Sequence, residues 1–177
     1  ASRAGDRNEE AGRRLQITSI DPFPREALQG VPRVTVRKQE AQDVDPADFD
    51  VLEEGDMLLI DSTHVVKVGG EVPYLYLEIL PRLKKGVTVH VHDVHFPYNV
   101  PYPAEQYIFR WSKTRWPVFW NEAMLVQAFL CHNDSFRIRL SLPLLRHHCE
   151  DFLRETIPDY QPVVEEDLGT HFGSIWI

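Results

Sequence analysis

Acids and histidines follow two apolar runs of the sequence, in the stretches IDSTH and VHVHD. The first contains Asp61 and His64, and the second ends with His92 and Asp93. Carboxylates together with imidazoles suit a divalent cation, which leaves positions for water or a substrate oxygen. A neutral imidazole nearby can take a proton from a hydroxyl group that the cation has made more acidic. If the two runs are neighbouring strands, these four side chains share one cleft and form a candidate site.

Each histidine also has a purely structural interpretation. A lone histidine beside a strand usually serves packing, whereas two acid–histidine pairs at two strand ends favour a functional site. His90 lies on the same strand face as His92 but deeper in the strand, so we expect it to belong to the core or to support a ligand from behind.

A third acid, Asp21, follows the apolar run LQITSID and directly precedes Pro22. An acid at the carboxyl end of such a strand typically binds the ribose hydroxyls of a nucleotide-like cofactor. The same side chain is equally suited to cap the turn that Pro22 begins. The residues leave both roles for Asp21 open.

The elements that must position these residues alternate between strand and helix patterns. MLLID is apolar on both faces, as in a central parallel strand, and VTVHVHD alternates strictly. This order predicts an α/β fold with a Rossmann-like, mostly parallel sheet and helices on both faces, whose ligands bind at the carboxyl ends of the strands. Strands are predicted at 15–21, 33–39, 57–61, 87–93, 136–143 and 171–177, and helices at 43–56, 71–86, 121–132 and 144–155. Pro81 lies late in the helix at 71–86, so we expect it to kink or shorten that helix.

Residues 95–120 are crowded with aromatic residues and prolines and directly follow Asp93. Their position favours a lid-like insertion over an acceptor substrate. Packing of the same aromatic residues onto the sheet edge or a second copy of the chain is an equal alternative.

The composition bounds the class of protein. The chain has 177 residues, 43% of them hydrophobic and 26% charged, which predicts a single domain over 1–177 with a polar N-terminal segment, 1–14. Its net charge of −8 argues against a nucleic-acid partner, and no apolar run is long enough for a membrane span. Two cysteines and no secretory signal pattern predict a cytoplasmic protein with reduced thiols.

The motifs SIDPFP, GDMLLIDSTHVVKVGGEV, LEILPRLKKGVTVHVHDVHFPY and FWNEAMLVQAFL, with the terminal GSIWI, resemble one known family. They are similar to the class I S-adenosylmethionine-dependent methyltransferases, and in particular to methyltransferase domain family 24. Members of that branch occur in bacterial sugar, antibiotic and cell-surface biosynthesis. The resemblance covers roughly residues 15–140 and the tail, and its most specific part is IDSTH combined with VHVHD.

The resemblance implies a role for each candidate residue. Asp21 matches the acid that binds the donor's ribose, and Glu40 with Ala41 falls where the adenine ring is held. Asp61 matches an acid near the donor's methionine moiety that also binds the metal ion in metal-dependent relatives. The pair His92 and Asp93 matches further metal ligands there, although the first member is commonly an acid. His64 falls where related sugar methyltransferases place a general base.

The family opens with a strand and a glycine-rich loop that holds the donor's carboxypropyl group. Before Asp21 the chain has only Gly5 and Gly12, with no apolar strand ahead of them. We therefore expect an N-terminally incomplete domain, either shortened or without part of its donor site. On this interpretation, these residues alone bind the donor weakly.

The favoured function is methyl transfer from S-adenosylmethionine to a hydroxyl group of a small molecule or sugar, with a divalent ion such as Mg²⁺ assisting. The expected partner is the small-molecule acceptor. One alternative is a metal-dependent hydrolase that uses the same cluster with water as the nucleophile. The other is a catalytically inactive α/β domain for binding or assembly, with the aromatic segment as the interface of a homo-oligomer.

Overall fold

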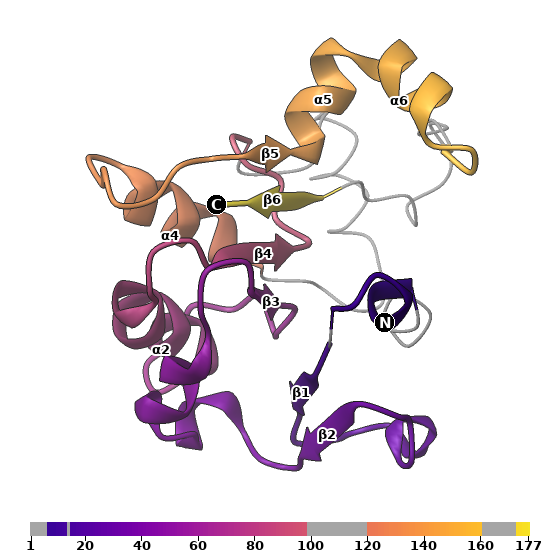
Figure 1. Cartoon of the computed structure of the whole chain (residues 1–177). Coiled ribbons are helices and arrows are strands. Elements are labelled where there is room, and N and C mark those ends of the chain that lie inside the picture. The colour runs from indigo at the N-terminus through magenta and orange to yellow at the C-terminus, as the bar shows by residue number, and fades with distance from the viewer. Residues whose placement is uncertain (1–6, 14, 99–119, 161–172) are drawn as a thin grey trace, which may run out of the picture. The chain divides into compact units, whose positions relative to one another are not determined.

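A computed structural model describes residues 7–13, 15–98, 120–160 and 173–177 of the chain (Figure 1). The chain divides into two compact units, residues 1–48 and 49–177. Most of the predicted lid-like insertion, residues 99–119, lies outside the described residues. The interpretation of 95–120 as a lid therefore stays a prediction.

The first unit contains a pair of parallel strands. β1 (Ile17–Ile20) pairs with β2 (Val34–Arg37), with Ile17 opposite Val34. β-Branched residues dominate both strands, as expected for pleated backbone. Single turns of 3-10 helix follow, η1 (Glu26–Leu28) after β1 and η2 (Ala41–Asp43) after β2.

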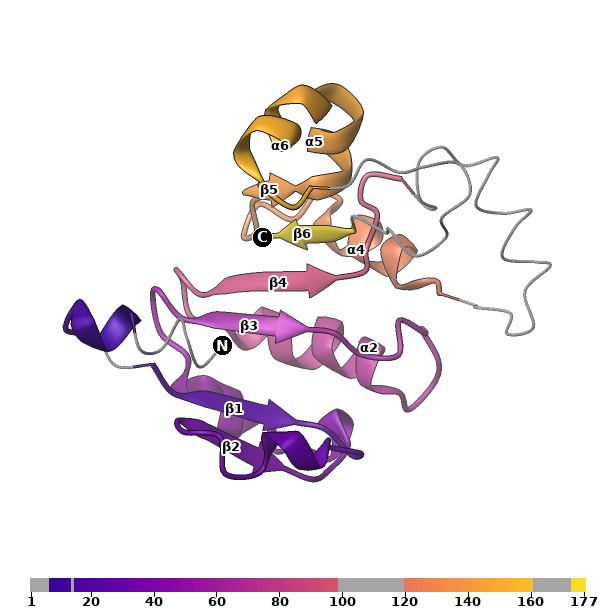
Figure 2. The ribbon, with the colours of Figure 1, turned by 90° about the vertical axis from the view of Figure 1, so that its right-hand side faces the viewer.

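The second unit is built on a four-stranded sheet of order β3-β4-β6-β5 (Figure 2). β3 (Met57–Ile60) and β4 (Thr88–His92) run parallel, with Leu59 opposite His90. β6 (Ser174–Trp176) is antiparallel to β4 and to the short strand β5 (Leu140–Ser141). The parallel pair places the ends of β3 and β4 at the same edge of the sheet, where Asp61 and Asp93 follow them.

One continuous helical segment connects β3 to β4. It begins as α2 (Glu71–Tyr74), widens into a π-helical turn, η4 (Leu75–Ile79), and tightens into a 3-10 turn, η5 (Leu80–Arg82). Leu83 is extended, so the segment ends four residues before the predicted stop at Gly86. Pro81 explains the early end, because its ring lacks the amide donor of a regular helix.

The remaining helices are α4 (Glu122–Leu130), α5 (Leu142–His148) and α6 (Glu150–Thr156). The predicted helix at 144–155 is divided in two at Cys149, whose φ of −140° and ψ of 39° are not helical. The predicted strand at 136–143 is reduced to two residues. The last residues of the predicted strand instead begin α5. The Ser141 hydroxyl caps this helix by accepting a hydrogen bond from the Leu144 amide, and Pro143 lies in its first turn.

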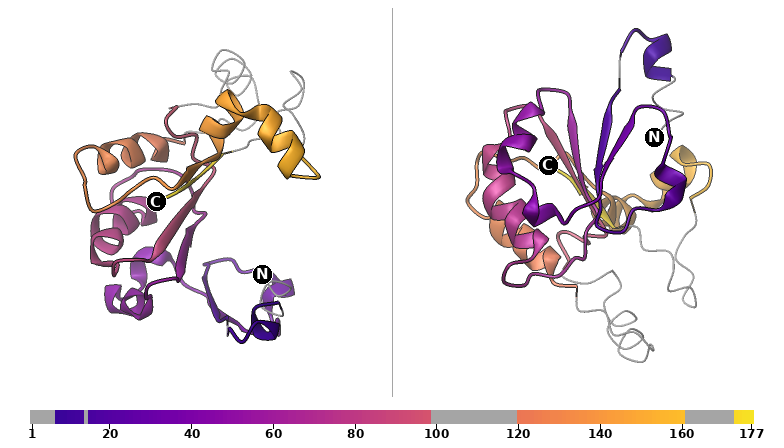
Figure 3. Two further views of the ribbon diagram at one scale, coloured as in Figure 1. Left: turned by 45° about the horizontal axis from the view of Figure 1, so that its top comes forward. Right: turned by 90° about the horizontal axis from the view of Figure 1, so that it is seen from below.

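The α2–η5 segment and α4 pack on the same face of this sheet (Figures 2 and 3). Burial of apolar side chains between these layers supplies the main stabilisation, about 1.5–3 kcal/mol for each large side chain. The fully or nearly fully buried residues of this core are Ile60, Val72, Tyr76, Ile79, Leu80, Val89, Val91, Val126 and Ile175.

The predicted α/β class, with parallel strand pairs and covering helices, is confirmed. The prediction of MLLID as a central strand is wrong for the described residues, since β3 is an edge strand of its sheet. Met57 and Leu59 accordingly have about half of their surfaces exposed, 55% and 54%. The predicted helix at 43–56 is replaced by 3-10 turns, η2 and η3 (Pro46–Val51).

Candidate active site

The loop that leaves β3 carries both Asp61 and His64 and is fastened at several points. The Thr63 amide donates to the Glu71 carboxylate at 3.0 Å, and the Val66 amide donates to the Asn121 side chain at 2.6 Å. The His64 carbonyl accepts from the first amide groups of α4, those of Asn121 and Glu122, at 3.0 and 3.2 Å. Two helix N-termini therefore hold the loop in one conformation.

His64 itself has a φ of +60°, a left-handed conformation that is costly for a residue with a side chain. The hydrogen bonds to its carbonyl and to its neighbours compensate that cost. Asp93, at the end of β4, also has a positive φ, of 53°, and its amide donates to the Gly173 carbonyl at 2.8 Å. At both residues the backbone therefore bends out of the line of the preceding strand, β3 for His64 and β4 for Asp93, at the same end of the sheet.

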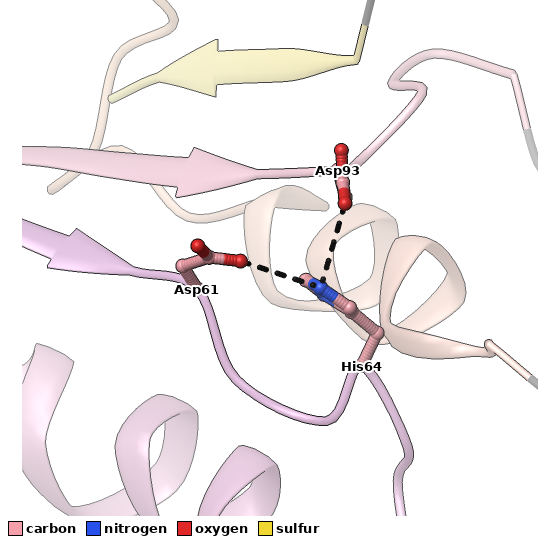
Figure 4. A group of neighbouring side chains, drawn as sticks. All are labelled: Asp61, His64 and Asp93. Atoms are coloured by element: carbon pink, nitrogen blue, oxygen red, sulfur yellow. Dashed lines mark ion pairs between the residues drawn. The ribbon is translucent and has the colours of Figure 1, made fainter. Parts of the chain in front are cut away.

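These turns bring three predicted site residues together (Figure 4). His64 Nε2 lies 3.7 Å from Asp61 Oδ1 and 3.9 Å from Asp93 Oδ2. His64 is buried, Asp61 is exposed and Asp93 is between the two. The group therefore opens to solvent on the side of Asp61.

His92, the fourth predicted residue, borders the same group from the sheet. Its Nδ1 lies 3.2 Å from Asp93 Oδ1 and 3.6 Å from Asp61 Oδ1. His90 has a different environment and stacks on Trp176, with ring centroids 4.1 Å apart. Burial, and then the neighbouring His92, lower the pKa of His90.

A buried acid, Glu122, completes the site and was not predicted from the sequence. Its Oε2 lies 2.7 Å from His64 Nδ1, and its Oε1 accepts a hydrogen bond of 2.9 Å from the Tyr76 hydroxyl. Glu122 is 1% exposed and Tyr76 is 0% exposed. An acid in the first turn of a helix is ordinarily explained by the helix dipole, so no local signal distinguishes Glu122.

The carboxylates dominate the electrostatics of His64. Burial by itself would lower the pKa of its imidazole, but the hydrogen bond to Glu122 and the charges of Glu122, Asp93 and Asp61 outweigh burial and raise it. Burial, followed by the charge of Glu122 and the hydrogen bond to it, raises the pKa of Tyr76 well above its usual value. Tyr76 therefore stays protonated and acts as a donor to Glu122.

The donor atoms of the cluster fit a single cation. Ligand–cation distances of about 2.0–2.2 Å place two ligand atoms roughly 3–4.4 Å apart, depending on the angle between them. The separations of 3.6 and 3.2 Å from His92 Nδ1 to Asp61 Oδ1 and Asp93 Oδ1 fall within that interval, so these three side chains can bind one ion without His64. His64 Nε2 also lies near both carboxylates, within 4.8 Å of one oxygen of each. Two carboxylates with an imidazole form a mixed oxygen–nitrogen set that suits divalent ions.

The residues assigned to the methyl donor, Asp21, Glu40 and Ala41, lie in the unit of residues 1–48. Asp21 Oδ1 accepts a hydrogen bond of 2.7 Å from the Phe23 amide, which is the turn-capping role that Pro22 suggested. Glu40 is exposed and accepts from the Gln42 side chain, and Ala41 begins η2. Their roles at the donor stay predictions.

The described residues form an α/β protein with a cluster of acids and histidines at the carboxyl ends of two parallel strands, which is where ligands bind in folds of this class. Residues 2–94 match the family described as a methyltransferase domain. Because the match covers more than half of the chain, the protein belongs to this methyltransferase domain family. The matched range includes Asp61, His64 and Asp93 but ends before Glu122. Searches of curated proteins and of solved structures gave no match.

Among the described residues, no helix combines the length and apolar character that crossing a membrane requires. Cys131 and Cys149 are both exposed as free thiols.

Proposed function

We propose that the protein transfers a methyl group from S-adenosylmethionine to a hydroxyl group of a small molecule or sugar, assisted by a divalent cation. Membership of the methyltransferase domain family supports methyl transfer, for which S-adenosylmethionine is the usual donor. The arrangement around His64 is the observation that carries the proposal. Its Nε2 faces Asp61 and Asp93 while its Nδ1 contacts Glu122.

Asp61 and Asp93 are proposed to hold the cation, with His92 as a further donor. A Mg²⁺-like ion bound there would orient the acceptor oxygen and make its hydroxyl more acidic. Binding of a positive ion between these carboxylates offsets two of the charges that raise the pKa of His64. It therefore favours the neutral imidazole, which a general base requires.

His64 is proposed to accept the hydroxyl proton at Nε2. As that oxygen–hydrogen bond breaks, the oxygen forms a bond to the methyl carbon, and the carbon–sulfur bond of the donor breaks with its electron pair retained by sulfur. The positive charge of the sulfonium is thereby exchanged for a proton on His64. Placing the oxygen in line with the methyl carbon is the main task of the remaining site residues.

The donor is proposed to bind with its ribose at Asp21 and its adenine near Glu40 and Ala41, with Asp61 near the methionine moiety. This assignment rests on the family and not on contacts between the two units. The chemistry of Asp21 permits it, since a carboxylate can accept hydrogen bonds from both ribose hydroxyls.

The experiment that tests the function follows a labelled methyl group. The native protein is incubated with methyl-labelled S-adenosylmethionine, Mg²⁺ and a panel of sugars and other hydroxyl compounds, and the products are analysed by mass spectrometry. We expect one labelled methyl group on a product oxygen. Cleavage of an acceptor without methyl addition would support the metal-dependent hydrolase instead, and bound ligands without turnover would support an inactive binding domain.

A further inference from the structure

We infer that Glu122 and Tyr76 form a positioning pair that keeps the proton of neutral His64 on Nδ1 and leaves Nε2 as a lone pair facing Asp61 and Asp93. This inference deepens the proposed function, because an Nε2 lone pair is what a general base at this site needs. The pair has no assigned role in the methyl transfer described above. Its test, however, requires neither the donor nor an acceptor nor a cation.

The choice of tautomer follows from distances on the two sides of the ring. Nδ1 lies 2.7 Å from Glu122 Oε2, a short hydrogen bond between two buried groups. Nε2 lies 3.7 and 3.9 Å from Asp61 and Asp93, which is too long for a hydrogen bond. A carboxylate only accepts hydrogen bonds, so the single proton of a neutral imidazole is most strongly held at Nδ1.

Tyr76 fixes the other end of Glu122. Its hydroxyl donates to Glu122 Oε1 at 2.9 Å, so each carboxylate oxygen has its own donor. The carboxylate is 1% exposed, and loss of either partner would leave a buried charge with fewer hydrogen bonds. The pair thus orients the carboxylate as well as the ring, and Trp120 packs against that ring with centroids 4.6 Å apart.

Glu122→Gln tests the control of the His64 tautomer, because the amide has almost the shape of the carboxylate but can also donate a hydrogen bond. We expect the Tyr76 hydroxyl to donate to the amide oxygen, as it donates to Glu122 Oε1 in the wild-type chain. The amide NH₂ then faces His64 Nδ1. An NH₂ group donates, so Nδ1 must then accept and the imidazole proton moves to Nε2. Removing the Tyr76 hydroxyl as well, in Glu122→Gln with Tyr76→Phe, frees the amide to turn over and present its oxygen to Nδ1.

The measurement is the nitrogen-15 spectrum of His64 in the full chain, at a pH high enough to leave the imidazole neutral. His64 is assigned by its loss in His64→Ala, and the free amino acid serves as the reference for both tautomers. We expect a protonated Nδ1 in the wild-type chain and in Tyr76→Phe, a protonated Nε2 in Glu122→Gln, and a return toward protonated Nδ1 in the double variant.

A protonated Nε2 in the wild-type chain would overturn the inference, and this result does not depend on any variant folding. Glu122→Gln with an unchanged tautomer would equally exclude control by the pair. Glu122→Asp, which keeps a carboxylate on a shorter side chain, should retain the protonated Nδ1. If Glu122 had only a structural role, the protonated nitrogen of His64 would not move to Nε2 in Glu122→Gln and back toward Nδ1 in the double variant.

The tautomer of His64 and the methyl-transfer activity can be tested separately. If the protein is active, Glu122→Gln should lower kcat by about 10²–10⁴-fold, the range of general-base effects, with KM little changed. The double variant should recover part of that loss. If no methyl transfer is detected, the spectrum still decides the inference about Glu122 and Tyr76, while the proposed function alone fails.

Discussion

The imidazole of His64 has acidic groups near both of its nitrogen atoms, but at unequal distances. Glu122 lies at hydrogen-bond distance from Nδ1, whereas Asp61 and Asp93 lie beyond hydrogen-bond distance from Nε2. We therefore assign orientation of the ring to the contact at Nδ1, and we propose that Nε2 accepts the proton.

Replacing His64 by Ala should lower kcat by about 10²–10⁴-fold, since it removes the proton acceptor. Affinity for the methyl donor should change little, because donor binding is assigned to other residues. Steady-state kinetics and calorimetry with S-adenosylmethionine measure the two quantities. His132→Ala, at an exposed histidine, is the control and should leave both unchanged. Full turnover in His64→Ala would remove His64 from the mechanism.

At the scale of elements, the loop after β3 depends on two helix beginnings for its conformation. Glu71 at the start of α2 accepts from both the amide and the hydroxyl of Thr63, and Asn121 before α4 accepts from the Val66 amide. These contacts are made within one unit and position the left-handed His64. Weakening them should affect the site before it affects the sheet.

Glu71 should give the loop a measurable dependence on acid. Burial alone would raise its pKa, but hydrogen bonds from the Thr63 side chain and from backbone amides, with the charge of Lys67, lower it. A lowered pKa contributes stability above the usual Glu value of about 4.3. That contribution is lost as the pH falls through the lowered pKa of the folded state.

Urea denaturation of wild-type and Glu71→Gln chains between neutral and acidic pH tests this. The wild-type advantage in free energy of unfolding should be present at neutral pH and shrink on acidification. Glu78→Gln, at an exposed glutamate of the same helical segment, should show no such trend. A Glu71→Gln difference that is constant with pH would contradict the assignment.

The turn before β4 is a second element that sets the site, because it fixes where His92 and Asp93 emerge. Gly86 has a φ of +94°, and a Cβ there would lie 2.5 Å from Glu54 Cγ. Gly69 has a φ of +70° with nothing within 4 Å of a Cβ.

Gly69→Ala should cost about 1–2 kcal/mol of unfolding free energy from backbone strain alone. Gly86→Ala should cost about 2–4 kcal/mol, since a contact is added to the strain. Equal losses in thermal denaturation would show that the contact at Gly86 is relieved at no cost.

The sequence predicted the site residues that follow the strands, but it did not predict Glu122, which supports His64. Alternation in VTVHVHD and the apolar run MLLID fix which residues leave the sheet together, because strand periodicity is a local property. Glu122 lies 58 residues from His64 in the sequence, and only packing of α4 beside the α2–η5 segment brings them into contact. Pro81 indicates the early end of the helix at Arg82 from the sequence, because proline lacks the amide donor of a regular helix. The short β5 was not predictable in this way, since it depends on the hydrogen bond from the Leu144 amide to the Ser141 hydroxyl.

At the scale of the whole molecule, the described strands form two separate sheets, β1–β2 and β3-β4-β6-β5. The residues proposed for the cation and the proposed base His64 all lie in the second unit, whereas the residues proposed for the donor ribose and adenine lie in the first. Cation binding is therefore a part of the proposed function whose assigned residues all lie in one unit. The net charge of −8 adds a general attraction for cations that a test must separate from a specific site.

Titration of the chain with Mn²⁺, followed by the loss of the free-ion electron paramagnetic resonance signal, measures whether Asp61 and Asp93 bind a divalent cation. Mn²⁺ is a suitable probe because it accepts the same carboxylate and imidazole ligands. The account predicts one bound ion per chain and loss of that binding in Asp61→Asn with Asp93→Asn. Asp134→Asn with Asp159→Asn removes the same charge at exposed positions and should bind as the wild type does. Absence of bound Mn²⁺ in the wild-type chain, or equal binding by both double variants, would contradict the account.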